Sequence, residues 1–397
     1  MHNWKVATAA MLDEMVALRR AIHTEPELGL KTPATTKKAR AALEGLPLEF
    51  ADGGSTTGFV ATLRGPSGGK TVLLRADMDA LPLDEETGLA FTSQIPGAMH
   101  ACGHDAHVAM LVGAARALCE RKDSLPGTVQ FMFQPGEEGW HGARHMLDDG
   151  LIKPLPDAAF AIHVTPNIPS GTMTGRPGPM LAAADRFEII IEGKGGHASQ
   201  PHDAVDPVPV AGDLASAIHA MVTRRIPAFD PCVITTGRLM AGNACNVIPA
   251  TAVIEGTIRS FSETTRELAC DGLRRLAEHI PAAHLCRGSI TIEPVFPVTV
   301  CDHSIAAIAK CAALELVESG EWIDMPFPAM GAEDFSYVLQ KVPGAMIFLG
   351  ATPEGGDWRD CCALHSNKMV LDEKVMALGA ALHCAFVEAY FARNLIS

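Results

Sequence analysis

Hydrophobic positions along the chain change between helical spacing and short β-branched runs, and this alternation predicts an α/β protein. Met11, Met15, Leu18 and Ile22 recur at steps of three and four residues, which predicts an amphipathic helix from Asn3 to His23. Further helices are expected over Thr35–Leu46, Val108–Cys119, Val208–Met221, Thr264–His279, Ser304–Glu318 and Lys374–Tyr390. Short apolar runs predict strands over Gly58–Leu63, Thr71–Leu74, Val129–Phe133, Ala158–Ile162, Phe187–Ile191, Val233–Thr236, Ala252–Ile258, Ile290–Pro294 and Ala345–Leu349.

The order of these elements predicts two domains, one inserted into the other. A segment rich in proline and glycine, Gly175–Pro179, separates an α/β pattern from a strand-helix-strand-strand-helix-strand pattern. The second pattern is typical of a ferredoxin-like α+β domain, which we place at residues 184–294. The flanking residues 1–183 and 295–397 are expected to form one discontinuous catalytic domain, with a mixed, mostly parallel sheet flanked by helices.

Charge and cysteine content exclude several classes of partner and fold. Lys and Arg number 32 against 46 Asp and Glu, a formal charge of −14, which argues against nucleic-acid or anionic-membrane partners. The 11 cysteines form no paired C-x-x-C framework, so a disulfide scaffold is not expected. Met1 to Arg20 lacks a long apolar core, and no eighteen apolar residues run together. We therefore expect a cytoplasmic protein.

The stretch from Met99 to His107 is the first candidate for metal chemistry. Cys102 and His104 are two residues apart, so a thiolate and an imidazole can point to the same place in an extended or turning backbone. Such a donor pair suits a borderline-soft divalent ion. By itself the stretch fits a histidine-rich loop with a buried, inert cysteine equally well.

Three further positions supply matching donors. Glu137 and Glu138 follow an apolar strand between two glycines, so one carboxylate could bind a cation while the other handles a proton. A bare pair of glutamates is more often a solvated loop, and His163 or His365 alone is more often an ordinary polar side chain. Taken together, five donors are too many for one tetrahedral ion and suit two ions with a shared ligand: Cys102, His104, Glu138, His163 and His365.

Eight motifs in a fixed order carry a family resemblance over nearly the whole chain. They are Arg-Ala-Asp-Met-Asp-Ala-Leu-Pro (75–82), Met-His-Ala-Cys-Gly-His-Asp (99–105), Pro-Gly-Glu-Glu-Gly (135–139), Ile-His-Val (162–164), Gly-Lys-Gly-Gly-His-Ala-Ser (193–199), Asn-Val-Ile-Pro (246–249), Gly-Ala-Glu-Asp-Phe (331–335) and Leu-His-Ser (364–366). In these motifs the chain resembles the metal-dependent aminoacylase and carboxypeptidase family. More narrowly, it is similar to the hippurate-hydrolase and indole-acetyl-amino-acid-hydrolase branch.

The resemblance implies a two-metal amidohydrolase whose inserted domain (184–294) forms a homodimer, with a higher oligomer as an alternative. The implied metal ligands are the five donors above, and Glu137 would be the general base. Asp79 would not bind a metal ion itself but would contact one of the ligands and hold it in the correct orientation. His197 would reach the partner subunit's site and help hold the oxyanion, while Asn246 and Arg259 would bind the α-carboxylate of the substrate.

Two departures from the family pattern bear on specificity. The wider family has a histidine ligand where Asp77 aligns here, and a bridging carboxylate where this branch has its cysteine. In the narrower branch, glycines usually follow Glu-Glu-Gly, whereas this chain has Trp140 and His141. Trp140 is expected either to pack in the core or to form a wall of an acyl pocket.

The expected reaction is hydrolysis of the amide bond of N-acyl or N-aroyl amino acids, which are small-molecule substrates, to a carboxylic acid and a free amino acid. Two divalent ions, manganese or zinc with cobalt or nickel as alternatives, would acidify a water whose proton Glu137 accepts. A dipeptidase, a carboxypeptidase or an N-acetyl-amino-acid (including diaminopimelate) deacetylase would use the same centre. A non-enzymatic metal or thiol sensor is the alternative of a different class. It would need no base beside the metal.

Overall fold

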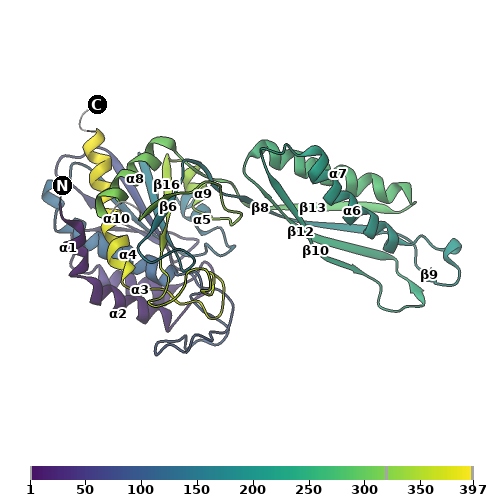
Figure 1. Ribbon diagram of the computed structural model, residues 1–397, viewed down its shortest axis with the longest axis horizontal. Coiled ribbons are helices and arrows are strands. Elements are labelled where there is room, and N and C mark those ends of the chain that lie inside the picture. The colour runs from purple at the N-terminus through teal and green to yellow at the C-terminus, as the bar shows by residue number, and fades with distance from the viewer. Residues whose placement is uncertain (1, 318–320, 395–397) are drawn as a thin grey trace. The chain divides into compact units, whose positions relative to one another are not determined.

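The computed structural model describes residues 2–317 and 321–394, and the chain divides into two compact units (Figure 1). Unit 1 comprises residues 1–180, 300–327 and 334–397. Unit 2 comprises residues 181–299 and the short segment 328–333, which lies outside the insert expected from the sequence.

An eight-stranded sheet forms the centre of unit 1. Its strands are, in spatial order, β1 (Glu49–Asp52), β2 (Phe59–Arg64), β4 (Thr128–Gln134), β3 (Thr71–Asp77), β5 (Ala158–Thr165), β16 (Gly344–Gly350), β6 (Met173–Gly175) and β15 (Trp322–Asp324). The pairs β4–β3, β3–β5, β5–β16 and β6–β15 are parallel, and β1–β2, β2–β4 and β16–β6 are antiparallel. The predicted α/β class with a mixed, mostly parallel sheet is therefore confirmed.

Helices pack against this sheet and against one another. They are α1 (Trp4–Ala9), α2 (Leu12–His23), α3 (Pro33–Ala42), α4 (His104–Cys119), α5 (Gly142–Asp148), α8 (His303–Leu316), α9 (Ser336–Leu339) and α10 (Val375–Asn394), with a 3₁₀ turn over Lys122–Ser124. In α4, every residue except Arg116 is buried, because α2 and α10 cover the sides that the sheet leaves open. Within the described residues, α10 is the one helix long and apolar enough to cross a membrane, but 72% of its apolar window is buried in the unit, as in a core helix.

The structure corrects the predicted helix from Asn3 to His23, which breaks into α1 and α2 at Ala10 and Met11. The two helices pack against different neighbours: α1 packs on α10, and α2 packs on α4. The Thr8 hydroxyl bonds to the carbonyl oxygen of Ala377 in α10 at 2.8 Å, which ties α1 to that helix. The predicted end of another helix, Glu318, lies outside the described residues.

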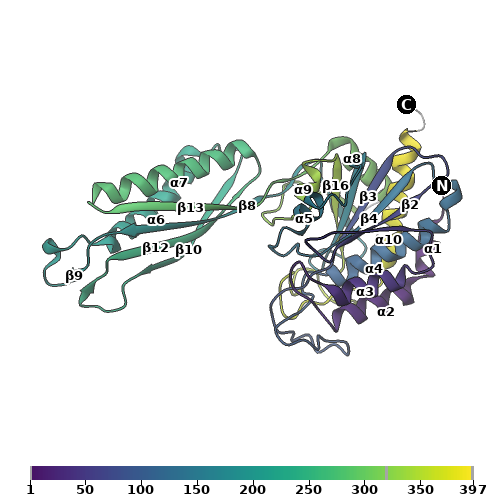
Figure 2. The ribbon, with the colours of Figure 1, turned by 180° about the vertical axis from the view of Figure 1, so that it is seen from behind.

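Unit 2 is an antiparallel sheet covered by two helices. Its elements are β8 (Ala183–Glu192), α6 (Pro207–Arg225), β10 (Cys232–Ala241), β12 (Thr251–Ser260), α7 (Glu263–Ala283) and β13 (Arg287–Phe296). The strand order β10-β12-β8-β13 with this chain order is the ferredoxin-like arrangement. Both helices cover the same face of the sheet (Figure 2).

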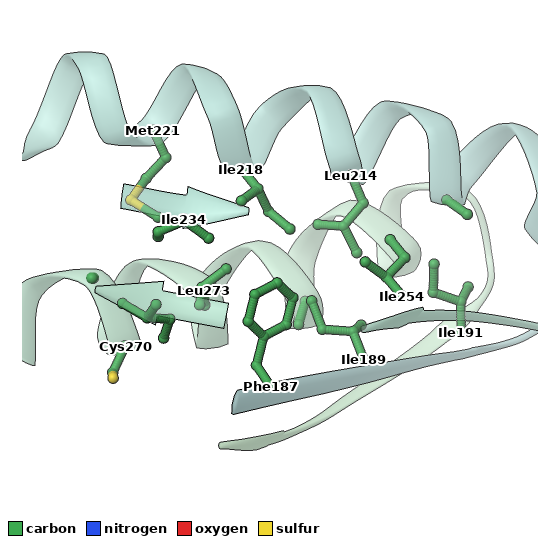
Figure 3. Packing of buried hydrophobic residues seen from close by; sticks show 14 of the residues in the cluster. Phe187, Ile189, Ile191, Leu214, Ile218, Met221, Ile234, Ile254, Cys270 and Leu273 are labelled. Carbon is green, nitrogen blue, oxygen red and sulfur yellow. The ribbon is translucent and has the colours of Figure 1, made fainter. Parts of the chain in front are cut away.

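Residues of alternating strand positions form the core of unit 2 between the sheet and its helices. Leu214 and Ile218 of α6 and Leu273 of α7 point toward Ile189 and Ile254 of the strands (Figure 3). The opposite face of the sheet is open and carries the intervening, more exposed positions. Smaller elements complete the structure: β9 (Gly196–His197) pairs with β11 (Val247–Ile248), β7 (Gly178–Leu181) pairs with β14 (Thr299–Cys301), and Pro201–Asp203 is a 3₁₀ turn.

Candidate metal centre

A left-handed glycine between Cys102 and His104 brings their side chains together. Gly103 has φ = 84°, and a Cβ at this position would collide with the side chain of Val164. The chain reverses here and His104 becomes the first residue of α4, four residues earlier than the sequence pattern indicates. The ligand atoms of Cys102, His104 and His163 all lie within 4.8 Å of one another.

Cys102 also belongs to a second group of donors. Its sulfur and the ligand atoms of Glu138 and His365 lie within 4.8 Å of one another, with 3.3 Å between Oε1 of Glu138 and Nε2 of His365. His365 has φ = 66°, which is unusual for a residue other than glycine and typical of functional positions. The structure thus brings all five predicted ligands together, with one thiol common to both groups.

Backbone carbonyls orient two of the imidazoles. Nδ1 of His104 donates to the carbonyl oxygen of Asp79 at 2.9 Å, and Nδ1 of His163 donates to that of Val164 at 2.6 Å. Each ring therefore turns Nε2 toward the other donors, and in its neutral form offers the lone pair of that atom, as metal-binding histidines do. Nε2 of His163 lies 3.5 Å from the sulfur of Cys102.

Two buried donor atoms in the centre lack a hydrogen-bond partner among the described residues. They are Nε2 of His104 and Oε1 of Glu138. A buried polar atom without a partner costs about 1–3 kcal/mol, and a cation between these atoms would remove that cost. The donor set therefore fits divalent metal ions.

The charges of the centre also favour a cation. The nearby Cys102 sulfur and the Glu138 carboxylate, whose Oε1 lies 3.3 Å from Nε2 of His365, raise the pKa of His365 to about 10. Burial works to lower the pKa of His104, but the negative charge of Asp77 and the hydrogen bond to Asp79 outweigh it and raise the pKa well above its ordinary value. Burial raises the pKa of the Cys102 thiol, so this cysteine needs the positive charge of an ion to become a thiolate.

Asp79 and the turn from Gly136 to Gly139 hold Glu137 and Glu138 in position. The carboxylate of Asp79 accepts hydrogen bonds from the backbone N–H groups of Glu137 at 2.9 Å and Glu138 at 3.0 Å. Gly136 and Gly139 have φ values of 78° and 81°, which turn the chain on both sides of the pair. Ligand atoms of Glu137, Glu138 and His104 lie within 4.8 Å of one another, so the expected base adjoins the expected ligands.

A buried polar network lies behind these residues, and sequence reasoning had assigned its members no role. Val164 N–H donates to Nε2 of His107 at 2.9 Å, so Nδ1 of His107 donates to the carboxylate of Asp77, 2.5 Å away. Asp77 and Asp334 both accept from the guanidinium of Arg75, at 2.5 and 3.0 Å. Asp334 belongs to the motif at residues 331–335, and this motif was the only signal in the sequence that pointed to Asp334.

The other predicted residues occupy two places. His197, Asn246 and Arg259 belong to unit 2, and Trp140 belongs to unit 1. Trp140 directly follows the turn that carries Glu137 and Glu138, and its side chain is 55% exposed. The expectation that it packs in the core is therefore wrong.

Comparisons with known proteins agree with this centre. The family model described as Peptidase family M20/M25/M40 matches residues 73–389. Thermostable carboxypeptidase 1 of Saccharolobus solfataricus is 40% identical over 377 residues, 94% of each chain. The IAA-amino acid hydrolase ILR1-like 2 of Arabidopsis thaliana is 36% identical over 384 residues, 96% of this chain and 86% of the relative.

A solved structure extends the likeness to three dimensions. It is the crystal structure of a dinuclear metal-binding peptidase from the M20 family of Bacillus subtilis, with a TM-score of 0.83 and 33% identity, covering 97% of this chain and 99% of that chain. Because the chain belongs to a family of hydrolases, the alternative hypothesis that the protein is a non-enzymatic metal or thiol sensor is excluded. The chain belongs to peptidase family M20/M25/M40 and is a metal-dependent hydrolase of amide bonds.

Proposed function

We propose that the protein hydrolyses N-acyl or N-aroyl amino acids to a carboxylic acid and a free amino acid, with two divalent ions per chain. The ligands are Cys102, His104, Glu138, His163 and His365. One observation carries the proposal: the Cys102 sulfur belongs to both groups of donors, so the five residues would provide ligands for two ions. Manganese or zinc suits this mixture of sulfur, nitrogen and oxygen donors, with cobalt or nickel as alternatives.

The residues around the ligands supply the proton chemistry. The bound ions contribute Lewis acidity, which acidifies water and polarises an amide carbonyl. Glu137 accepts the proton of the attacking water and passes it to the leaving amine. Its position is held by the hydrogen bond from its own N–H to Asp79 and by the N–H of Asp334, which lies 3.3 Å from its Oε1.

His197 is suited to hold the developing oxyanion. Ser199 N–H donates to Nδ1 of His197 at 3.1 Å, and the Ser199 hydroxyl lies 2.8 Å from the same atom. The neutral ring therefore carries its proton on Nε2, and the side chain is exposed. An exposed N–H donor of fixed tautomer can stabilise a negative oxygen.

Arg259 is suited to bind the amino-acid carboxylate. The side chain is partly buried, and no ion pair or hydrogen bond links its guanidinium to another described residue. Burial lowers the pKa of this guanidinium, a cost that a bound carboxylate would offset through two parallel hydrogen bonds. This feature favours substrates with a free α-carboxylate.

Asn246 lies beyond the first residue of β12, where its carbonyl oxygen accepts from Ala198 N–H, whereas Arg259 near the last residue of β12 pairs with Ala184 at the start of β8. Eight residues of strand span about 26 Å, so these two side chains cannot hold one small carboxylate within a single chain. We therefore propose a homodimer through residues 184–294, in which His197 and Asn246 serve the site of the partner subunit. The ten-residue edge strand β10, with Val233 and Leu239 exposed, supports pairing with a second copy.

All eleven cysteines of the described chain are unpaired, which supports the proposed cytoplasmic location.

Carboxypeptidase or dipeptidase activity is the second candidate function. It is favoured by the 40% identity to thermostable carboxypeptidase 1 and needs the same metal centre and carboxylate reader.

A substrate panel tests the proposal. Metal-reconstituted protein is assayed with N-benzoyl, N-acetyl and N-glycyl forms of one amino acid, beside Glu137→Gln prepared in the same way. We expect kcat/KM for an N-acyl substrate to exceed that for the dipeptide at least tenfold. A dipeptide preferred by the same margin would favour the peptidase, and no hydrolysis of any of the three would contradict both.

A further inference from the structure

Two loops of unit 1 interlock through a pair of glycines. A Cβ on Gly29 would lie 3.1 Å from Cε2 of the Trp140 indole, and a Cβ on Gly136 would lie 2.6 Å from Cδ2 of Leu30. Each loop therefore places one large apolar side chain on a glycine of the other loop. Gly29 has φ = 68°, a backbone conformation that favours glycine, and a Cβ there would press on the indole, which would have to give by a few tenths of an ångström.

Both loops are tied to the candidate metal centre. Ala80 N–H donates to the carbonyl oxygen of Glu27 at 2.8 Å, which holds the first loop against the residue after Asp79. The Asp79 carboxylate in turn accepts from Glu137 and Glu138 of the second loop. Trp140 follows Glu138 by two residues, at most about 7 Å of backbone.

The indole is fixed in position yet open to solvent. Gly29 lies against one part of the ring, and Trp140 as a residue is 55% exposed. Leu28, which flanks Gly29, is 41% exposed. Trp140 packed on Gly29 forms an apolar shelf two residues from Glu138, and a preorganised aromatic surface binds flat apolar groups at low entropic cost.

We propose that this shelf determines acyl specificity: the open part of the Trp140 indole contacts the acyl half of the substrate and favours aromatic acyl groups over acetyl. The inference rests on the proposed hydrolysis of N-acyl amino acids and names the class of acyl group. Gly29 positions the indole, since a side chain there would press on the ring and shift it.

The experiment compares kcat/KM for N-benzoyl and N-acetyl forms of one amino acid in Trp140→Leu and Gly29→Ala. Both variants should lower the benzoyl-to-acetyl ratio by about tenfold, the value of an aromatic contact made in the transition state. Gly45→Ala is the matched control, because Gly45 has φ = 77° and nothing within 4 Å of its Cβ position. It imposes the same kind of backbone strain and should leave the ratio unchanged. Unchanged ratios in both test variants would overturn the proposal.

Binding of benzoate, the acid product, tests the shelf without turnover. By calorimetry with the metal-loaded protein, Trp140→Leu and Gly29→Ala should weaken benzoate binding about tenfold, and Gly45→Ala should not. If the wild-type protein hydrolyses no N-acyl amino acid but shows this pattern, the proposed function fails and the shelf stands. If it hydrolyses them and benzoate binding is equal in all four proteins, the shelf is wrong and the function stands.

Discussion

The backbone N–H of Asp334 donates a hydrogen bond to Oε1 of Glu137 at 3.3 Å, although 197 positions separate the two residues. The side chain of Asp334 is fully buried and accepts from Arg75, Gln134 and Ala143 N–H. Asp334 therefore links two central strands and the start of α5 to the expected general base.

Asp334→Asn should destabilise the protein and misplace the base. Removing one partner of a buried ion pair costs about 3 kcal/mol, because the buried guanidinium of Arg75 loses a counter-charge. Urea unfolding should show this loss, and kcat should fall about tenfold with metal content retained. Asp324→Asn is the control, since Asp324 pairs with Lys310 on the surface and should cost less than about 1 kcal/mol. Equal unfolding midpoints for the two variants would contradict the role of Asp334.

Chelation should abolish amide hydrolysis, and a divalent metal should restore it, because the water is a poor nucleophile without Lewis acidity. Cys102→Ser should reduce the metal retained after gel filtration, since a hydroxyl is a much poorer donor than a thiolate. Elemental analysis measures this directly. Active wild-type protein that contains no transition metal would refute the metal centre, and unchanged metal content in Cys102→Ser would remove Cys102 from it.

Glu137→Gln should keep its metal and lose at least about a hundredfold in kcat, because the amide cannot accept a proton. Glu138→Gln should instead lose metal, since Glu138 Oε1 is a buried donor atom among the expected ligands. Metal content and kcat are measured on the same samples. The reverse pattern would mean that the roles of the two glutamates are exchanged.

Mixing two inactive proteins should restore part of the activity if His197 serves the partner subunit. Glu137→Gln and His197→Ala should each be nearly inactive as homodimers. After subunit exchange, each heterodimer contains one site with both an intact Glu137 and an intact His197. Recovery toward a quarter of wild-type activity is expected, and none after demonstrated exchange would show that each chain is self-sufficient.

His383 should make the protein less stable as the pH falls from 7.5 to 5. Burial lowers the pKa of His383 to about 3 in the folded protein, whereas an unfolded histidine has a pKa of about 6.5. Below pH 6.5 the unfolded chain gains a proton that the folded chain does not, so stability is present above this pH and is lost as the pH falls. The loss attributable to His383 is about 2 kcal/mol at pH 5.

Urea titrations at the two pH values test this prediction. His383→Leu should reduce the pH dependence of the unfolding free energy by that amount, because leucine takes up no proton in either state. His303→Gln, at an exposed position at the start of α8, is the control for replacing a histidine outside the core. An identical pH dependence in wild-type and His383→Leu proteins would show that His383 contributes nothing to it.

The amino-acid sequence alone predicted the α/β class, the strand-helix order of unit 2 and five donor residues that the structure brings into two groups sharing Cys102. These features depend on local patterns: apolar periodicity sets the elements, and donors at strand ends or helix starts are carried to one edge of a parallel sheet. Only the tertiary structure showed the break of the first helix, since its cause is packing against α10 and α4. The same holds for the contacts Asp334–Glu137 and Trp140–Gly29. Such relationships join residues far apart in the chain, and no local pattern encodes them because their energy appears only after the intervening segments have folded.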